Sequence, residues 1–170
     1  GKLMGRIEAI LLAAGYSSRM GRLKSLLPIG GTTVIRRQAE VLDGLTDRTI
    51  VVTGYRGDEV EAHLSGSRVT TVRNQAFAEG MFTSVKAGIL ALDQEVSAFL
   101  ILPVDYPLVT RSLIEDLIEE FHHSGAPVLY PSFSMRKGHP PVISAACIPD
   151  ILSYQGDAGL KGALTPFNSE

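Results

Sequence analysis

Small residues followed by two cations make the stretch LLAAGYSSRMGRLK a candidate anion-binding loop. Ala13, Ala14 and Gly15 carry almost no side-chain bulk, so backbone N–H groups at these positions can approach an anion closely. Arg19 and Lys24 add positive charge downstream, and the planar guanidinium of Arg19 suits phosphate oxygens. These residues alone leave two interpretations open, a phosphate cradle or a basic loop exposed to solvent.

Two well-known phosphate-binding patterns do not fit this loop. A P-loop places a lysine directly after its second glycine, whereas Lys24 stands two positions too late after Gly21. A dinucleotide-binding fingerprint needs three glycines at fixed spacing at the start of a helix, and that spacing is missing here. Both patterns are therefore rejected.

A second candidate is the acidic residue that follows the apolar run AFLILPV. This residue, Asp105, is expected at the same edge of a parallel sheet as the first loop. Mg²⁺ takes one or two carboxylates together with phosphate oxygens and waters. Two interpretations stay open for Asp105, a metal ligand or an aspartate that caps the turn or helix near Thr110.

The remaining nucleophilic and ligand-type side chains carry less information. Cys147 is the only cysteine, which excludes an internal disulfide and a multi-cysteine zinc site. We expect it to be a small core residue. We expect His63, His122 and His123 to be structural or exposed to solvent.

Composition limits the class of protein. A chain of 170 residues fits one domain over residues 1–170, and its 45% apolar and 20% charged residues are ordinary for a soluble globular protein. The net charge of −2 gives no reason to expect nucleic-acid or membrane partners. Since neither a membrane span nor a signal-peptide pattern is present, we expect a cytoplasmic protein.

The candidate residues must be positioned by secondary structure, and short apolar runs alternate with amphipathic patterns along the chain. Strands are expected at residues 8–13, 49–53, 68–73, 98–102 and 127–130. Helices are expected at residues 32–45 with Thr32 or Thr33 as cap, 57–64, 80–92 and 110–122 with a capping box at 112–115. This alternation predicts a three-layer α/β fold with a mostly parallel sheet, helices on both faces and a ligand site beyond the carboxyl ends of the strands.

The first loop also resembles a known family signature. LAAGYSSRMGRLKSLLP matches every fixed position of L-A-A-G-x-S-x-R-M-G-x-x-K-x-L-L-P, the signature of the MobA-like nucleotidyltransferases and in particular of their molybdenum cofactor cytidylyltransferase branch. The resemblance implies a Rossmann-like nucleotidyltransferase fold, with Arg19 and Lys24 on the triphosphate as catalytic residues. The nucleotide-binding residues that it implies in this loop are Leu12, Ala13, Ala14 and Gly15.

Two further motifs extend the nucleotide side of this resemblance. RNQAFAEGMFTSVKAGI is similar to N-x-x-x-x-x-G-M-x-x-S-x-x-x-G, which implies nucleotide contacts from Asn74, Gly80 and Ser84. The motif L-x-D-x-P implies that Asp105 binds Mg²⁺. The next residue, Tyr106, matches neither the glutamine of cytidylyl members nor the methionine of guanylyl members.

Two later segments resemble the acceptor side of the same branch. RKGHPPVIS is similar to the G-H-P segment, and GDAGLKG is similar to G-D-x-G-A-R with Lys161 in place of the arginine. The resemblance implies an anionic acceptor such as a pterin phosphate, held by His139, Asp157 and Lys161.

Taken together, the motifs imply transfer of a nucleoside monophosphate from a triphosphate, CTP by preference, to molybdopterin, with Mg²⁺ as cofactor and a molybdoenzyme as a further partner. The alternatives are guanylyl transfer, transfer to a sugar phosphate, and a non-catalytic nucleotide-binding module. LAAG rather than LAGG favours a pyrimidine by family analogy. The family's closing D-I-D-T-P-E-D segment, which supplies a second metal carboxylate, is not found before the final ALTPFNSE. We therefore expect either a truncated chain or a second metal ligand from elsewhere.

Overall fold

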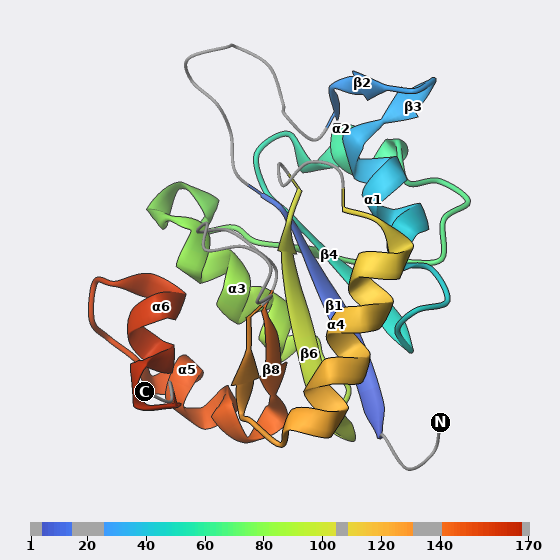
Figure 1. Cartoon of the computed structure of the whole chain (residues 1–170). Coiled ribbons are helices and arrows are strands. Elements are labelled where there is room, and N and C mark those ends of the chain that lie inside the picture. The colour runs from blue at the N-terminus through green and yellow to red at the C-terminus, as the bar shows by residue number, and fades with distance from the viewer. Residues whose placement is uncertain (1–4, 15–25, 105–108, 131–140, 168–170) are drawn as a thin grey trace.

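The main sheet is mostly parallel in the computed structural model, which describes residues 5–14, 26–104, 109–130 and 141–167 (Figure 1). Its strands lie in the order β5-β4-β1-β6-β8-β7. They are β1 (Arg6–Ala13), β4 (Arg48–Thr53), β5 (Thr70–Arg73), β6 (Val96–Pro103), β7 (Val128–Leu129) and β8 (Val142–Ser144). The first four of that order are parallel, whereas β8 is antiparallel to both β6 and β7.

Helices cover both faces of the sheet, so the predicted three-layer α/β fold is confirmed (Figure 1). On one face lie α1 (Val34–Leu42), α2 (Gly57–Ala62) and α4 (Arg111–Ser124). On the other lie α3 (Met81–Leu90), α5 (Ile148–Ser153) and α6 (Gly159–Leu164). Smaller elements are the hairpin β2 (Pro28–Ile29) and β3 (Thr32–Thr33) and the 3₁₀ turns η3 (Phe77–Glu79), η4 (Ala145–Cys147) and η5 (Thr165–Phe167).

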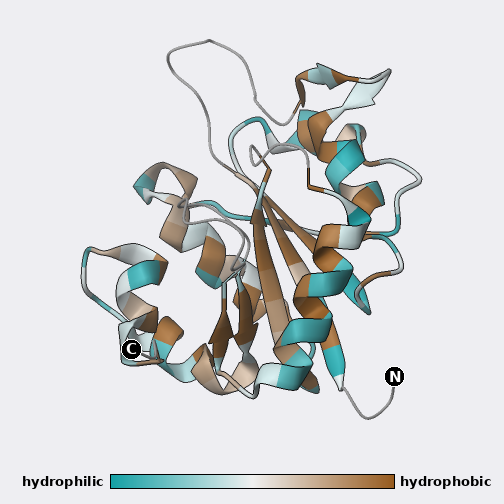
Figure 2. Cartoon of the chain, in the orientation of Figure 1, coloured by the Kyte–Doolittle hydropathy of each residue, from teal (hydrophilic) through white to brown (hydrophobic). Residues whose placement is uncertain are grey.

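The central strand β1 shows why the sheet needs two covering layers. Ile7 and Leu11 belong to the core on the α1 and α4 side, whereas Ile10 and Leu12 belong to the core on the α3 side. Because side chains alternate along a strand, a run that is apolar at every position must be buried on both faces. Figure 2 shows the strands as brown ribbons between helices that carry teal residues beside brown ones.

One predicted capping box is wrong, although its helix begins within one residue of the predicted start. Thr110, with an extended backbone, caps α4 by accepting a hydrogen bond from the Leu113 N–H over 3.2 Å. The predicted capping box at residues 112–115 would place the cap on Ser112. Since the helix already begins at Arg111, Ser112 lies inside its first turn.

Other boundaries confirm the predictions or extend them. Thr33, one of the two predicted caps of α1, accepts from the Arg36 N–H over 3.4 Å. Cys147 is fully buried, as expected. The short elements β8, α5 and α6 were not predicted, because three to six residues are too few to display a period. Among the described residues, no helix is long and apolar enough to cross a membrane.

A buried carboxylate interrupts the apolar sequence of β1 at its amino end. Glu8 has 0% of its side chain exposed. It accepts hydrogen bonds from Arg6 Nε over 2.6 Å and from the backbone N–H of Asp93 over 3.1 Å, and Arg48 Nη1 lies 3.7 Å away. We call these four residues the Glu8 cluster. It joins β1, β4 and the segment before β6 at the edge opposite the carboxyl ends of the strands.

Candidate active site

The carboxyl ends of β1, β4 and β6 meet at one edge, which is where open α/β sheets bind ligands. The N–H of Val104 donates to the carbonyl of Leu12 over 2.9 Å, and the N–H of Tyr55 donates to the carbonyl of Ala14 over 3.2 Å. Leu12, Ala13 and Ala14 are buried. They therefore form a fixed base from which the chain continues into the first loop.

Several predicted site residues lie outside the described residues. They are Gly15, Arg19, Lys24, Asp105 and His139. The structure places the other predicted residues, which are Leu12, Ala13, Ala14, Asn74, Gly80, Ser84, Asp157 and Lys161.

Gly54, directly after β4, brings η3 against the base of the first loop. A Cβ at this position would lie 2.7 Å from the Cβ of Phe77 and 3.0 Å from the Cβ of Ala14, so a side chain would force both apart. The rings of Tyr55 and Phe77 pack nearby with centroids 6.0 Å apart and planes at 57°. This contact was not predicted, although a glycine at a strand end is a known signal of close backbone approach.

Asn74 follows β5 and ties the strand to the first turn of α3. Its side chain is almost fully buried. Its Nδ2 donates to the hydroxyls of Thr83 and Ser84, each over 2.9 Å, and its Oδ1 accepts from the N–H of Ala76 over 3.0 Å. The Thr83 hydroxyl in turn reaches the carbonyl of Gly80 at 2.7 Å and that of Ala76 at 3.1 Å. We call these five residues the Asn74 cluster.

Gly80 makes the sharp turn that its residue type predicts. Its φ of 117° lies in the region that favours glycine, and it is the cap residue of α3 without a side chain to offer. Because α3 follows β5, its amino end lies at the carboxyl edge of the sheet. The first N–H groups of a helix and its dipole favour negatively charged or polar ligands. Ser84, one turn into the helix, is 3% exposed.

Two arginines at this edge, Arg56 and Arg73, form ion pairs with neighbouring carboxylates. Arg73 donates to Asp58 over 2.8 Å and to Glu61 over 3.0 Å, and these carboxylates raise the pKa of its guanidinium. Glu61 also accepts from the Thr53 hydroxyl over 2.9 Å. Arg56 pairs with Glu59, whose carboxylate raises the pKa of Arg56. Both arginines are thus neutralised by neighbours in the structure.

The predicted acceptor segment packs beside α3 around one aromatic ring. Tyr154 meets the ring of Phe82 edge-on at 5.9 Å, its carbonyl accepts from Lys86 Nζ over 3.3 Å, and its hydroxyl accepts from the Ala158 N–H over 3.3 Å. A Cβ at Gly156 or Gly162 would lie 2.3 or 2.2 Å from that hydroxyl oxygen. The first and last of the three glycines of GDAGLKG therefore make room for Tyr154.

Asp157 and Lys161 are both exposed to solvent on this segment. Neither is placed in the hydrogen-bonded clusters at the carboxyl edge. Tyr154, which was not predicted as a site residue, contacts Phe82 and Lys86 of α3 from their segment. Its signal in the sequence is indirect, because two glycines that follow a tyrosine indicate crowding only once the fold is known.

The sequence pattern of the MobA-like NTP transferase domain matches residues 9–169 of this chain. The chain belongs to the MobA-like NTP transferase family. The molybdenum cofactor cytidylyltransferase of Escherichia coli (strain K12) is 33% identical to it over 162 residues, which cover 95% of this chain and 82% of that protein. The predicted family and the predicted enzyme class, a nucleotidyltransferase, are therefore confirmed.

Two other similarities are to proteins with different names. A nucleotidyl transferase from Methanothermobacter is 28% identical, with a TM-score of 0.77 over 94% of this chain and 80% of that one. The bifunctional protein GlmU of Ruthia magnifica is 32% identical over 128 residues, which cover 74% of this chain but 28% of GlmU. The similarity to GlmU therefore concerns one part of that longer protein.

In this MobA-like domain, the predicted Mg²⁺ ligand, Asp105, lies outside the described residues. Within the described residues, no group of three or more His, Cys, Asp or Glu side chains could hold a metal ion. Asp105, the predicted ligand, directly follows the described Val104 in the chain, whose N–H bond to Leu12 fixes the end of β6 beside β1. A carboxylate at this edge has the oxygen donors that Mg²⁺ prefers.

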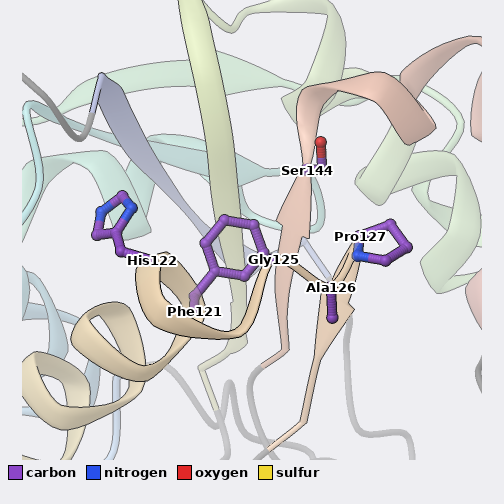
Figure 3. A pocket seen from close by; sticks show the side chains of 6 residues that line it. All are labelled: Phe121, His122, Gly125, Ala126, Pro127 and Ser144. Carbon is purple, nitrogen blue, oxygen red and sulfur yellow. The ribbon is translucent and has the colours of Figure 1, made fainter.

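A pocket of about 320 Å³ lies at the other end of the sheet, between the end of α4 and the ends of β7 and β8 (Figure 3). It is lined by Phe121, His122, Gly125, Ala126, Pro127 and Ser144. The Nε2 of His122 has no hydrogen-bond partner among the described residues, and burial lowers the pKa of this imidazole. Figure 3 shows the His122 ring directed away from Ala126 and Pro127. This pocket is remote from the carboxyl edge and contains no predicted site residue.

Proposed function

We propose that this nucleotidyltransferase moves a cytidylyl group from CTP to the phosphate of a molybdopterin-type acceptor and releases pyrophosphate. The observation that carries the proposal is the 33% identity to a molybdenum cofactor cytidylyltransferase over 95% of the chain. The fold supports it, because the predicted nucleotide and metal positions lie in the sequence at or after the carboxyl ends of the parallel strands β1, β5 and β6. We place the reaction in the cytoplasm, with a molybdoenzyme as the recipient of the product.

On the nucleotide side, the backbone of the first loop is proposed to hold the triphosphate and part of the base. Leu12, Ala13, Ala14 and Gly15 begin this loop, and the first three stand on the buried base of the edge. Arg19 and Lys24 are the proposed phosphate ligands. This role is consistent with the pairing of Arg56 and Arg73, whose charges carboxylates already neutralise.

The wall of the nucleotide site opposite the first loop is proposed to be the start of α3. Asn74, Gly80 and Ser84 belong to it, and Gly54 lets this wall approach the base of the first loop. At Gly54, Ala14 from the base of the first loop and Phe77 from the segment before α3 come close together. A ligand that binds between them would touch both.

The acceptor side is proposed to involve His139, Asp157 and Lys161. Asp157 and Lys161 are exposed and thus accessible to a ligand. Tyr154 connects their segment to Phe82 and Lys86 of α3, the helix that begins at the proposed nucleotide site. Both substrates would therefore be held by segments that pack on the same helix.

Mg²⁺ is proposed as the divalent cation, with Asp105 as its protein ligand. When bound, such an ion neutralises charge on the phosphates and orients them. The chain's own contribution is to hold the triphosphate through Arg19, Lys24 and the backbone N–H groups of the first loop. An acceptor phosphate is mostly dianionic at neutral pH, since its second pKa is about 6. Its oxygen can therefore attack the α-phosphorus in line without a general base.

A pyrophosphate-release assay tests the proposal. The purified chain is incubated with molybdenum cofactor, or with a sugar phosphate in its place, and each of CTP, GTP, UTP and ATP, with and without Mg²⁺. Release that requires CTP, Mg²⁺ and the molybdopterin acceptor supports the proposal. Release with GTP indicates guanylyl transfer, and release with a sugar phosphate as acceptor indicates a reaction of the sugar-phosphate class. Nucleotide binding without release would favour the non-catalytic module.

A further inference from the structure

We infer that Thr83, held by Asn74, is a positioning residue that fixes the start of α3 for nucleotide binding. The inference deepens the proposed function and rests on it. Thr83 is not among the residues that the family motif marks. Its importance emerges from the contacts of its hydroxyl.

The first step is that both side-chain N–H groups of Asn74 are used within the protein. Its two amide protons go to the hydroxyls of Thr83 and Ser84, its carbonyl oxygen accepts from Ala76, and its backbone N–H donates to the carbonyl of Thr53 over 2.7 Å. A carboxamide offers two donors and one acceptor oxygen. Asn74 therefore acts on a ligand through the residues that it holds.

The second step is the direction of the Thr83 hydroxyl. Because its oxygen accepts a hydrogen bond from Asn74 Nδ2, the hydroxyl's own single proton is directed to one of the two carbonyls within reach. The carbonyl of Gly80 at 2.7 Å is closer than that of Ala76 at 3.1 Å. Asn74 thus orients Thr83 toward Gly80.

The third step links this bond to the ligand edge. Gly80 has a φ of 117° and no side chain to restrict it, so contacts of its backbone must select the conformation. The Gly80 carbonyl accepts from the Thr83 hydroxyl over 2.7 Å and from the Thr83 backbone N–H over 3.2 Å, and these two bonds hold the peptide group that leads into α3. That peptide group includes the N–H of Met81, the first N–H of the helix and a donor at the carboxyl edge. The hydroxyl therefore adds the side-chain bond that helps to position this donor for the nucleotide.

The test compares Thr83→Val, which removes the hydroxyl and keeps the shape, with Thr83→Ser, which keeps the hydroxyl. Thr46→Val is the matched control, because Thr46 is also partly exposed and its hydroxyl donates to the carbonyl of Arg48 over 3.1 Å at the opposite edge. Calorimetry measures the Kd of CTP with Mg²⁺, and thermal unfolding without nucleotide measures Tm. The amide ¹H–¹⁵N cross-peaks of Gly80 and Met81 report the local backbone.

We expect Thr83→Val to weaken CTP binding on the order of tenfold, the factor that one lost hydrogen bond in the binding-competent state can produce. Thr83→Ser should restore most of the affinity. Thr46→Val should lower Tm by a similar amount as Thr83→Val and leave the Kd unchanged. The cross-peaks of Gly80 and Met81 should shift in Thr83→Val alone.

The inference is overturned if the unaltered chain binds CTP and Thr83→Val binds it equally well, or if Thr46→Val weakens binding to the same extent. If Thr83→Val does not fold, Thr83→Ala takes its place in the same comparison with Thr83→Ser. A wild-type chain that binds none of the four nucleoside triphosphates would overturn the proposed function and the inference with it. These results are distinguishable, because only the last concerns the unaltered protein.

Discussion

The two ends of the parallel sheet each hold a buried polar cluster, and the clusters differ in charge and in the segments that they join. The Glu8 cluster, at the amino end, surrounds a carboxylate with two arginines and a backbone N–H from three separate parts of the chain. The Asn74 cluster, at the carboxyl end, is neutral, and all its members lie between residues 74 and 84. The Glu8 cluster connects separate strands, whereas the Asn74 cluster holds the chain segment that leads from β5 into α3.

Because of this difference, we expect the two clusters to affect different properties of the protein, its stability and its ligand binding. Loss of the Glu8 carboxylate would weaken contacts between β1, β4 and the segment before β6, which hold the sheet together. Loss of an Asn74 cluster hydroxyl would change the path of the chain into α3 and leave the sheet in place. We therefore expect substitutions at the amino end to change the free energy of unfolding, and substitutions at the carboxyl end to change ligand affinity or turnover.

The largest effect that this comparison predicts lies in the first loop. Arg19→Ala should reduce turnover at least about a hundredfold, as expected when a charge that stabilises the transition state is removed. Tm should change little, because a loop cation contributes little to the core. Steady-state pyrophosphate release measures the turnover.

The matched control for Arg19→Ala is Arg22→Ala, since Arg22 lies in the same loop at a position that the signature leaves free. It should keep nearly all activity. Equal losses in the two variants would show that the loop responds to its overall charge, and the proposed role of Arg19 would then be wrong.

At the opposite end, Glu8→Ala should lower the free energy of unfolding by about 2 kcal/mol, because a buried acceptor of several hydrogen bonds is lost while its arginines stay partly solvated. The affinity of the folded protein for nucleotide should be unchanged. Urea unfolding and calorimetry measure the two quantities.

For Glu8→Ala the control is Glu40→Ala, which breaks the pair with Arg36 at 3.5 Å, where the glutamate is 61% exposed. Its cost should stay below about 0.5 kcal/mol. If Glu8→Ala weakened nucleotide binding without lowering stability, the division between the two ends would fail.

A third region, around Tyr154, sharpens the comparison because it joins the predicted acceptor segment to α3. Gly156→Ala should cost about 1 kcal/mol or more, since its Cβ would lie 2.3 Å from the Tyr154 hydroxyl oxygen and the ring must move. In the Tyr154→Ala background the same substitution should cost much less. Strictly additive unfolding free energies in this double-mutant cycle would contradict the crowding explanation.

The smallest expected effect is a pH dependence at the amino end. Burial lowers the pKa of His122 below its ordinary value of 6.5. The folded chain therefore binds a proton at His122 less readily than the unfolded chain does, so this effect leaves stability highest above about pH 6.5 and lowers stability as the pH falls through that value. From about pH 7.5 to 5.5, Tm should fall less in His122→Gln than in wild type.

His123→Gln, one position along the same helix and exposed, provides the comparison for this effect. Its Tm should follow the wild-type pH profile. Identical slopes for all three proteins would mean that His122 does not contribute to the acid sensitivity.

The sequence was sufficient for the elements that bury long apolar runs. β1, β4 and β6 appear near their predicted positions because each run is apolar on both faces. The predicted capping box at residues 112–115 was wrong because two residues close together, Thr110 and Ser112, can each cap a helix. Only the backbone conformation decides between them. β8 is too short to be recognised beside a proline-rich segment.

For the candidate site, the motifs identified positions, and the structure added how some of them are held. Gly80 was predicted to turn the chain, and its φ confirms this. The partners of Asn74 were not predictable, because no sequence period links a residue after a strand to hydroxyls on the following helix. Tyr154 and Gly54 act through contacts between segments distant in the sequence, which a single sequence does not display.

Glu8 also determines how the central strand pairs with its neighbours. From Ile7 to Ala13, all residues of β1 except Glu8 are apolar and buried. Hydrophobic burial alone would therefore not distinguish the observed pairing from one in which β1 is shifted by one residue along β4 and β6. Such a shift would turn Glu8 to the opposite face, among the apolar side chains that pack against α1 and α4, and away from Arg48 and the Asp93 N–H. An unpaired carboxylate there would be costly. A single charged residue thus gives the central strand one alignment, and with it one position for the loop that begins at its carboxyl end.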